Sequence, residues 1–161
     1  MPAYPSTTRH TWPVKTTNQL EKPRYIIFGF QTGRDNIAKK RADEFDNCGL
    51  KNFKVFLNQE YFPYNDLNID FSTYDIAKAY EMFVRFQGNY YNISLDPVVN
   101  RDTYINKYPL IVVDCSKHNE DVKEGVVDIK LEIKTGDNST ASTAAYCLII
   151  HEKEFQYKPM S

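Results

Sequence analysis

The chain has 161 residues, which is enough for one well-buried core and too few for two. Its 20 basic and 21 acidic residues give a formal net charge of -1, which excludes a global electrostatic attraction to nucleic acid or anionic lipid. Aromatic residues make up 14% of the sequence, with 12 Tyr and 10 Phe, an excess typical of half-buried strands and of contact surfaces between proteins.

The cysteines and the N-terminal residues indicate the cellular compartment in which the protein is expected to work. Cys48, Cys115 and Cys147 form an odd set without CxxC spacing, which favours a reducing compartment over a disulfide framework or a zinc ribbon. The first residues contain no apolar run of signal-peptide length, and no segment approaches the roughly 18 apolar residues of a membrane span. We therefore expect a protein that is not secreted and has no membrane partner.

The N-terminal part divides into an arm and an edge strand. Residues 1–11 contain two prolines and several Ser and Thr, too little apolar surface to fold alone, and are predicted to form a flexible arm. Residues 12–20 are predicted to form a short edge strand, because Pro13 is tolerated mainly at a sheet edge or a strand start. Residues 12–161 are then expected to form a single domain.

Two strands and a loop are predicted next. Residues 24–32 form a β-branched and aromatic run that ends at Gly33, which is typical of a strand. Residues 50–57 place apolar side chains at alternate positions, as a strand with one buried face does. The charged residues 33–47 between them are predicted to form a loop, with a helical turn around residues 37–45 as the alternative.

A helical period interrupts the strands between residues 72 and 87. Apolar residues recur there at helical spacing on one face. Ser72 and Asp75 resemble a capping box at the start, and Gly88 is predicted to end the helix. One inserted helix of about four turns is therefore expected over 72–87.

The C-terminal half has the clearest strand patterns. Residues 110–115 form a short apolar run that suits a strand buried on both faces. Residues 127–134 alternate strictly between apolar and charged side chains, which predicts one face in water. Residues 144–150 are predicted to form another buried strand, and residues 154–157 a short closing one.

About seven short strands with one helix favour an all-β fold, a jelly-roll-like β-sandwich with one inserted helix. An immunoglobulin-like sandwich is the competing architecture. It is less favoured because the Cys…Trp…Cys pattern is missing and the helix would be a large insertion.

Four strings, in this order along the chain, carry a resemblance to a known family. They are Glu21-Lys-Pro-Arg-Tyr-Ile-Ile-Phe-Gly-Phe-Gln-Thr32, Leu57-Asn58 with Tyr61-Phe-Pro-Tyr64, Asp114-Cys-Ser116, and Ala145-Tyr-Cys-Leu-Ile-Ile-His151. Together they resemble the C-terminal part of double-jelly-roll major capsid-like proteins. Polinton/Maverick-like elements, adintovirus-like viruses and endogenous viral elements of invertebrates encode such proteins. The resemblance runs from about Trp12 to Pro159.

The resemblance implies a structural capsid or capsid-like protein that self-assembles into capsomers or a shell, with neither catalysis nor a cofactor. In that family two jelly rolls stand side by side, and trimers form pseudo-hexagonal units of the shell. This chain is long enough for one jelly roll. The implied partners are other capsid-protein chains, further copies of itself in a homo-oligomer such as a trimer, or a missing N-terminal jelly roll. The implied location is the virion, or the host cytoplasm or nucleus during assembly.

Aromatic residues near the predicted loops are the candidate assembly interface, because such rings bury a large area at a small cost in side-chain entropy. These residues are Tyr61, Phe62, Tyr64, Tyr90 and Tyr91. Most other rings are expected to fill the core. The alternative function is a monomeric β-sandwich that binds a carbohydrate or a protein, with Tyr61 and Tyr64 stacked on the ligand.

One basic cluster is a weak candidate for nucleic-acid contact. It consists of Lys39, Lys40 and Arg41. Asp43 and Glu44 follow closely, which favours a solvated surface whose charges pair with each other.

A thiol enzyme and a metal centre are both disfavoured. Cys115, His118 and His151 could supply a nucleophile and a base, or three metal ligands, but their spacing establishes neither site. Cys115 ends an apolar run, where a cysteine is usually a small buried hydrophobic residue. A thiol enzyme would instead require a solvent-open thiol with a low pKa. No catalytic residue, cofactor site or metal site is therefore predicted.

Overall fold

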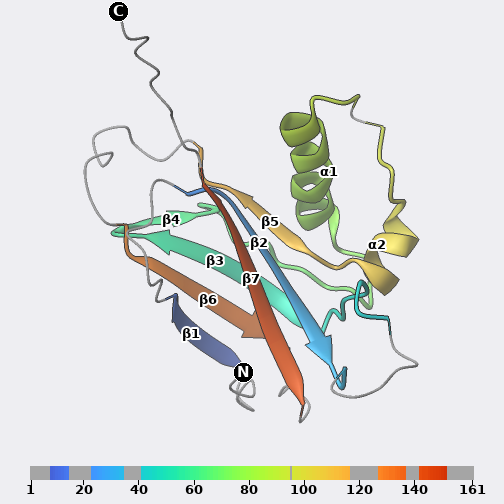
Figure 1. Ribbon diagram of the computed structural model, residues 1–161. Helices are drawn as coiled ribbons and strands as arrows, with labels where there is room; N and C mark the ends of the chain where they lie inside the picture. Colours follow the sequence, from blue (N-terminus) through green and yellow to red (C-terminus); the bar gives the residue numbers. More distant parts are fainter. Residues whose placement is uncertain are drawn as a thin grey trace, which may run out of the picture.

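The computed structural model describes most of the chain and shows a two-layered β-sandwich with helices on one side (Figure 1). The residues described are 8–14, 23–34, 41–94, 96–116, 127–136 and 142–151. The elements within them are β1 (Arg9–Val14), β2 (Pro23–Thr32), β3 (Leu50–Leu57), β4 (Glu60–Phe62), α1 (Ala77–Tyr91), α2 (Arg101–Lys107), β5 (Ile111–Asp114), β6 (Ile129–Thr135) and β7 (Thr143–His151).

The first sheet has the strand order β1-β6-β3-β4, and its neighbouring strands are all antiparallel. β6 is buried at every second residue because its sequence alternates apolar and charged side chains. β1 pairs over its whole length with residues 129–134 of β6, with Trp12 opposite Leu131. The strictly alternating pattern therefore predicted the inner and outer faces of this sheet correctly.

The second sheet has the strand order β5-β2-β7 and is also antiparallel. Ile111, Val112 and Val113 of β5 are all buried. The inner face of β5 meets the core, and α1 packs against this strand, as Figure 1 shows. The prediction that this run is buried on both faces is confirmed.

The core lies between the two sheets. Phe28 of β2 stacks on Phe53 of β3 with the ring centroids 4.6 Å apart, and Phe30 meets Phe28 edge to face at 4.9 Å. All three rings are fully buried. Because they come from both sheets, they tie the two layers into one hydrophobic core.

The first helix is displaced along the chain from the predicted range of 72–87. Ser72 does not cap it, because its hydroxyl donates to the carboxylate of Asp70. Residues before Ile76 form a turn that the Asp70–Asp75 bridge closes, and α1 begins at Ala77. The helix then continues through Gly88, the predicted stop, and ends at Tyr91, where Asn92 caps it in a left-handed conformation.

A second helix, α2, was not predicted. Asn100 caps it, since its side-chain oxygen accepts a hydrogen bond from the backbone N–H of Thr103 at 2.8 Å. Its Tyr104 is fully buried and contacts Tyr80 and Phe83 of α1 at centroid distances of 5.4 Å and 5.2 Å. The helix spans only 7 residues, which is too short for periodicity to reveal.

Strand β7 was predicted to be buried, and that prediction is wrong. It lies at an edge of the second sheet, and Tyr146 and Leu148 are exposed on it. β1 begins at Arg9, three residues earlier than predicted and inside the expected arm. The rest of the predicted edge strand, from residue 15 to 20, and the strand at 154–157 lie outside the described residues.

Candidate assembly interface

The candidate aromatic residues lie in two groups of contacting rings. The first, the β4 aromatic group, consists of the candidates Tyr61, Phe62 and Tyr64 together with Phe56, and it lies around the β3–β4 hairpin. Tyr61 and Tyr64 are exposed, and their ring centroids lie 6.1 Å apart at an interplanar angle of 65°. Phe62 is only 5% exposed and belongs to the core. It therefore anchors the hairpin and offers no contact surface.

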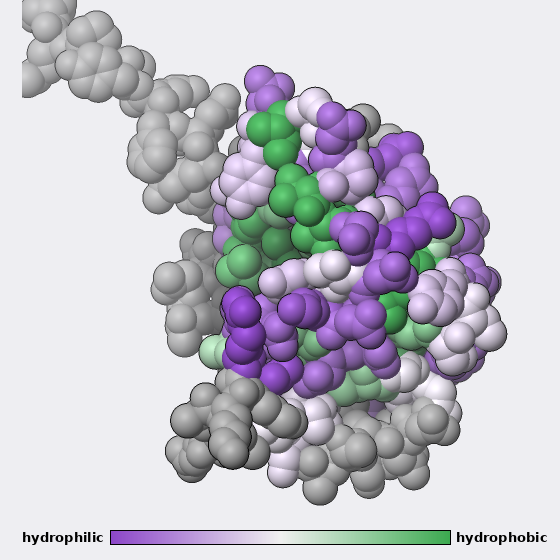
Figure 2. Space-filling model, turned by 90° about the vertical axis from the view of Figure 1, so that its right-hand side faces the viewer, coloured by the Kyte–Doolittle hydropathy of each residue, from purple (hydrophilic) through white to green (hydrophobic). Residues whose placement is uncertain are grey.

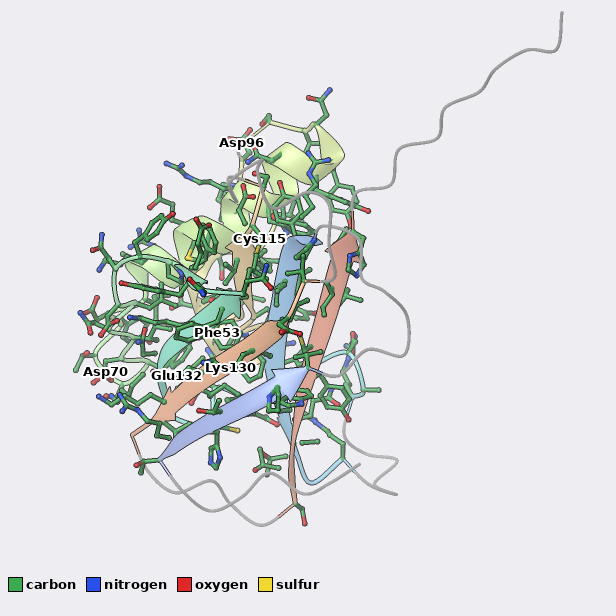
Figure 3. The ribbon with its side chains drawn as sticks, turned by 90° about the vertical axis from the view of Figure 1, so that its left-hand side faces the viewer. Phe53, Asp70, Asp96, Cys115, Lys130 and Glu132 are labelled. Atoms are coloured by element: carbon green, nitrogen blue, oxygen red, sulfur yellow. The ribbon has the colours of Figure 1, made fainter. Side chains whose placement is uncertain are left out.

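Lysines cover part of the β4 aromatic group. The ammonium of Lys54 lies 4.9 Å from the centroid of the Tyr61 ring, and that of Lys130 lies 4.3 Å from the centroid of Phe56. Lys54 also pairs with Asp66 at 2.7 Å, and this hydrogen bond lowers the pKa of the Asp66 carboxyl. Figure 3 shows Lys130 and Glu132 along β6, with Phe53 within the fold. This surface therefore carries both aromatic and charged side chains, and Lys54 and Lys130 already have partners within the chain.

The second group, the α1-end aromatic group, consists of Tyr25, Phe86, Tyr90 and Tyr91. Tyr25 is buried and meets Phe86 edge to face at 4.9 Å, and Phe86 stacks on Tyr90 at 5.2 Å. Tyr91 meets Tyr90 at 5.1 Å and is 62% exposed. The exposed rings are thus held in place by a ring in the core, which fixes the surface that they present.

Further apolar residues reach the surface after α1. Ile93 and Val98 lie in the loop that follows the helix, and both are exposed. Figure 2 shows hydrophobic side chains between hydrophilic ones on the side of the molecule that carries the helices. These two residues and the exposed side chains of β7 were not predicted as contact residues from the sequence. For Ile93 and Val98, their place in a polar segment just after a helix was the available signal.

Of the basic cluster, only Arg41 is described by the structure, since Lys39 and Lys40 lie outside the described residues. Its guanidinium lies 2.7 Å from the Asp43 carboxylate and 3.8 Å from that of Glu44. The hydrogen bond from Arg41 lowers the pKa of the Asp43 carboxyl. Arg41 is therefore engaged with acidic neighbours, as the sequence had suggested.

Cys115 does not have the environment of a catalytic thiol. Its side chain is fully buried, and burial raises its pKa to about 12. A nucleophilic cysteine has a lowered pKa and some access to solvent. Of the two histidines proposed as partners, His151 ends β7 and His118 lies outside the described residues.

The described residues contain no cluster of three or more His, Cys, Asp or Glu side chains that could hold a metal ion. Neither α1 nor α2, the helices that these residues form, is long and apolar enough to span a membrane.

A polar hollow of about 580 Å³ lies beside β3 and the end of β6. Its charged walls pair with each other: the Lys51 ammonium lies 2.7 Å from the Asp70 carboxylate, whose pKa it holds well below the usual range together with Ser72. Ser72 and Thr73 also donate backbone hydrogen bonds to Asp70. The acidic group is thus engaged in closing the 70–75 turn and is not presented to a ligand.

Comparison with known proteins identifies the family. A family model described as a double jelly roll-like domain matches residues 1–154, a region that includes both sheets and both helices. The comparisons with curated proteins and with solved structures gave no match. Since the family model covers nearly the whole chain and the fold is a β-sandwich, the chain belongs to the double jelly roll-like domain family.

Proposed function

We propose that this protein is a structural, capsid-type module that self-assembles with further copies into capsomers or a shell, without catalysis or a cofactor. The observation that carries the proposal is the α1-end aromatic group, whose exposed rings are packed onto the core of a double jelly roll-like domain. The four strings that resemble capsid-like proteins of Polinton/Maverick-like and adintovirus-like elements support a viral origin. The virion, or the host cytoplasm or nucleus during assembly, is then its location.

Energetics favour these rings as contact residues. Burying an exposed large apolar side chain contributes roughly 1.5–3 kcal/mol. Tyr90 already stacks on Phe86, so an incoming partner has less side-chain freedom to restrict. Ile93 and Val98 add apolar surface in the adjoining segment. An assembly that covers this group therefore gains apolar burial at a reduced entropic cost.

The alternative function is a monomeric module that binds a carbohydrate or a protein through Tyr61 and Tyr64. Sugar stacking uses the open face of a ring. Tyr61 already has the Lys54 ammonium over its ring, and the planes of Tyr61 and Tyr64 meet at 65°. This geometry does not favour the stacking of a sugar on Tyr61 and Tyr64.

The proposal is tested by measuring the mass in solution by light scattering coupled to size exclusion, across a range of protein concentration. The wild-type chain is expected to form oligomers whose mass grows in whole multiples of 18.8 kDa. The variant Tyr90→Ser/Tyr91→Ser is expected to shift this equilibrium to smaller species, because it removes both exposed rings.

The matched control is Tyr74→Ser, which removes an exposed tyrosine that belongs to neither aromatic group. It should leave the mass distribution unchanged, and circular dichroism should show that both variants remain folded. A wild-type chain that stays monomeric at the highest concentration would contradict self-assembly and favour the ligand-binding module.

A further inference from the structure

Strand β7 is an edge strand without the usual protection of an edge. Within the described ranges it pairs with β2 on one side and with no strand on the other. Its 9 residues, TAAYCLIIH, contain no proline and no Lys, Arg, Asp or Glu. Natural edge strands are usually kept from pairing by charges, prolines, bulges or a short length. β7 has none of these features where it pairs with Tyr25–Thr32 of β2, because the register of the two strands is regular there.

The side chains of β7 divide between two faces. Ala145, Cys147 and Ile149 pack against the core, so the intervening residues Tyr146 and Leu148 point to the outer face. Leu148 is 59% exposed. The outer row is therefore apolar where a solvent-facing strand would carry polar residues, which marks it as a contact surface.

The backbone hydrogen bonds show which groups face the open edge. The N–H of Gly33 donates to the carbonyl of Ser142 at 2.9 Å, so these two residues are a hydrogen-bonded pair of the β2–β7 ladder. Hydrogen-bonded pairs alternate along antiparallel strands, so the even-numbered residues of β7 bond to β2. The N–H and C=O groups of Ala145, Cys147 and Ile149 consequently point away from β2.

We propose that β7 pairs antiparallel with β7 of a second copy of this chain, across a two-fold axis at Cys147. Cys147 is the midpoint of Thr143–His151, so this register pairs the central part of the strand, from Ala144 to Ile150. It also places Ala145 opposite Ile149 of the second copy, and Tyr146 opposite Leu148. Ala145 and Ile149 then pair on the inner face and the two exposed side chains Tyr146 and Leu148 pair on the outer face, and the two sheets join as β5-β2-β7-β7-β2-β5.

The inference depends on the proposed function for its choice of a second copy as the partner. It adds an interface separate from both aromatic groups, which lie at β4 and at the end of α1. The two interfaces are compatible, since one uses a strand edge and the other uses exposed rings. An assembly can therefore lose one interface and keep the other, and experiments can test them separately.

The first test is amide hydrogen exchange of the full chain, resolved by residue, at low and high protein concentration. The amides of Ala145, Cys147 and Ile149 should exchange at least tenfold more slowly at high concentration, because each gains an acceptor from the second copy. The amides of Tyr146 and Leu148 serve as internal controls, since they already donate to β2. Unchanged exchange of the odd-numbered amides in a protein that does assemble would overturn the inference and leave the proposed function standing.

The second test is the variant Leu148→Lys, with Tyr74→Lys as the matched control on another exposed side chain, 63% accessible to solvent and outside both aromatic groups. Leu148→Lys should abolish the concentration-dependent protection and reduce the mass of the assembly, whereas Tyr74→Lys should keep both. Equal protection in both variants would overturn the β7 pairing. A wild-type chain that does not assemble at all would instead contradict both this inference and the proposed function.

The register is tested by mild oxidation with a copper–phenanthroline complex. Two thiols then give up two protons and two electrons to the oxidant, and one S–S bond forms. Directly opposite residues of a hydrogen-bonded pair have Cα atoms about 5.5 Å apart, within the range of a disulfide. Cross-linked dimers joined at Cys147 in wild type, and none in Leu148→Lys, are expected. Dimers joined only through Cys48 would overturn the register.

Discussion

Gly29 lies at the closest approach between β2 and the segments that cover its outer face. A Cβ atom at this position would come within 2.6 Å of Leu110 Cδ2 and 2.8 Å of Phe45 Cδ1. Real Cβ atoms do not approach so closely, so the side chains of the covering layer would have to move. The residue is glycine because there is no room for a side chain.

We expect Gly29→Ala to lower the free energy of unfolding by about 1–3 kcal/mol, as overpacking of a core does. Urea denaturation followed by circular dichroism measures this change. Gly136→Ala is the control, because its Cβ would meet the flexible end of Lys51 at 3.0 Å. A smaller loss for Gly29→Ala than for Gly136→Ala would contradict the packing argument.

The buried thiols make stability depend on pH in the alkaline range. Burial raises the pKa of Cys115 from its ordinary value of 9.0 to about 12, and that of Cys147 to about 11. Below pH 9 both thiols are protonated in the folded and unfolded states, and their contribution is complete. Above pH 9 the unfolded chain loses these protons first, so the free energy of unfolding falls as the pH rises from 9 to about 12.

Urea denaturation at pH 8, 9 and 10 measures this slope, and Cys115→Ala is the control that removes one of the titrating groups. The slope of the wild type should be steeper than that of the variant by up to roughly 1.4 kcal/mol per pH unit. Equal slopes would mean that Cys115 ionises normally in the folded chain.

At the level of elements, local patterns predicted strands better than helix ends. β3 was predicted with its observed bounds, because Phe53, Val55 and Leu57 recur at alternate positions and a turn follows directly. The predicted range of α1 was displaced from the observed one because Ser72 and Gly88 carry the usual signals of a helix start and a helix end. Ser72 instead bonds to Asp70, and packing of Phe86 and Tyr90 onto Tyr25 extends the helix past Gly88. Tertiary contacts outweighed the local signals.

Because Gly88 lies inside α1, replacing it should stabilise the protein. Gly88→Ala is expected to raise the free energy of unfolding by about 0.5–1 kcal/mol, the difference in helix propensity between the two residues. Thermal denaturation measures this as a higher Tm. Gly33→Ala is the contrasting variant, since Gly33 has a φ of +58° that alanine adopts only with strain, and its Tm should fall. A lower Tm for Gly88→Ala would indicate that this turn of α1 needs glycine.

At the scale of the whole molecule, the sequence predicted which aromatic residues lie near loops. It did not predict which of these rings contact one another. The grouping of Tyr90 with Tyr25 depends on the packing of α1 against the β5-β2 side of the sheet, which no local pattern encodes. The exposure of Leu148 depends on strand order, because an apolar run looks the same in a central strand and at an edge. Strand order is a long-range property, and for this reason the β7 surface could not be predicted.

The strand order also determines how the molecule unfolds. Trp12, the only tryptophan of the chain, reports on the four-stranded sheet, where it lies opposite Leu131. The ellipticity at 222 nm reports mainly on α1 and α2, and α1 packs on the other sheet. Since Phe28 and Phe53 stack between the sheets, both signals should change at the same urea concentration.

The variant Phe53→Ala tests this coupling. Removing the ring leaves a cavity beside Phe28 and should lower the free energy of unfolding by about 3–5 kcal/mol. If the sheets share one cooperative core, the fluorescence and ellipticity curves shift together by the same amount, because neither sheet stays folded alone. A shift of the Trp12 fluorescence curve alone would mean that the second sheet and its helices fold independently, and the residues from 12 onward would then not form one domain.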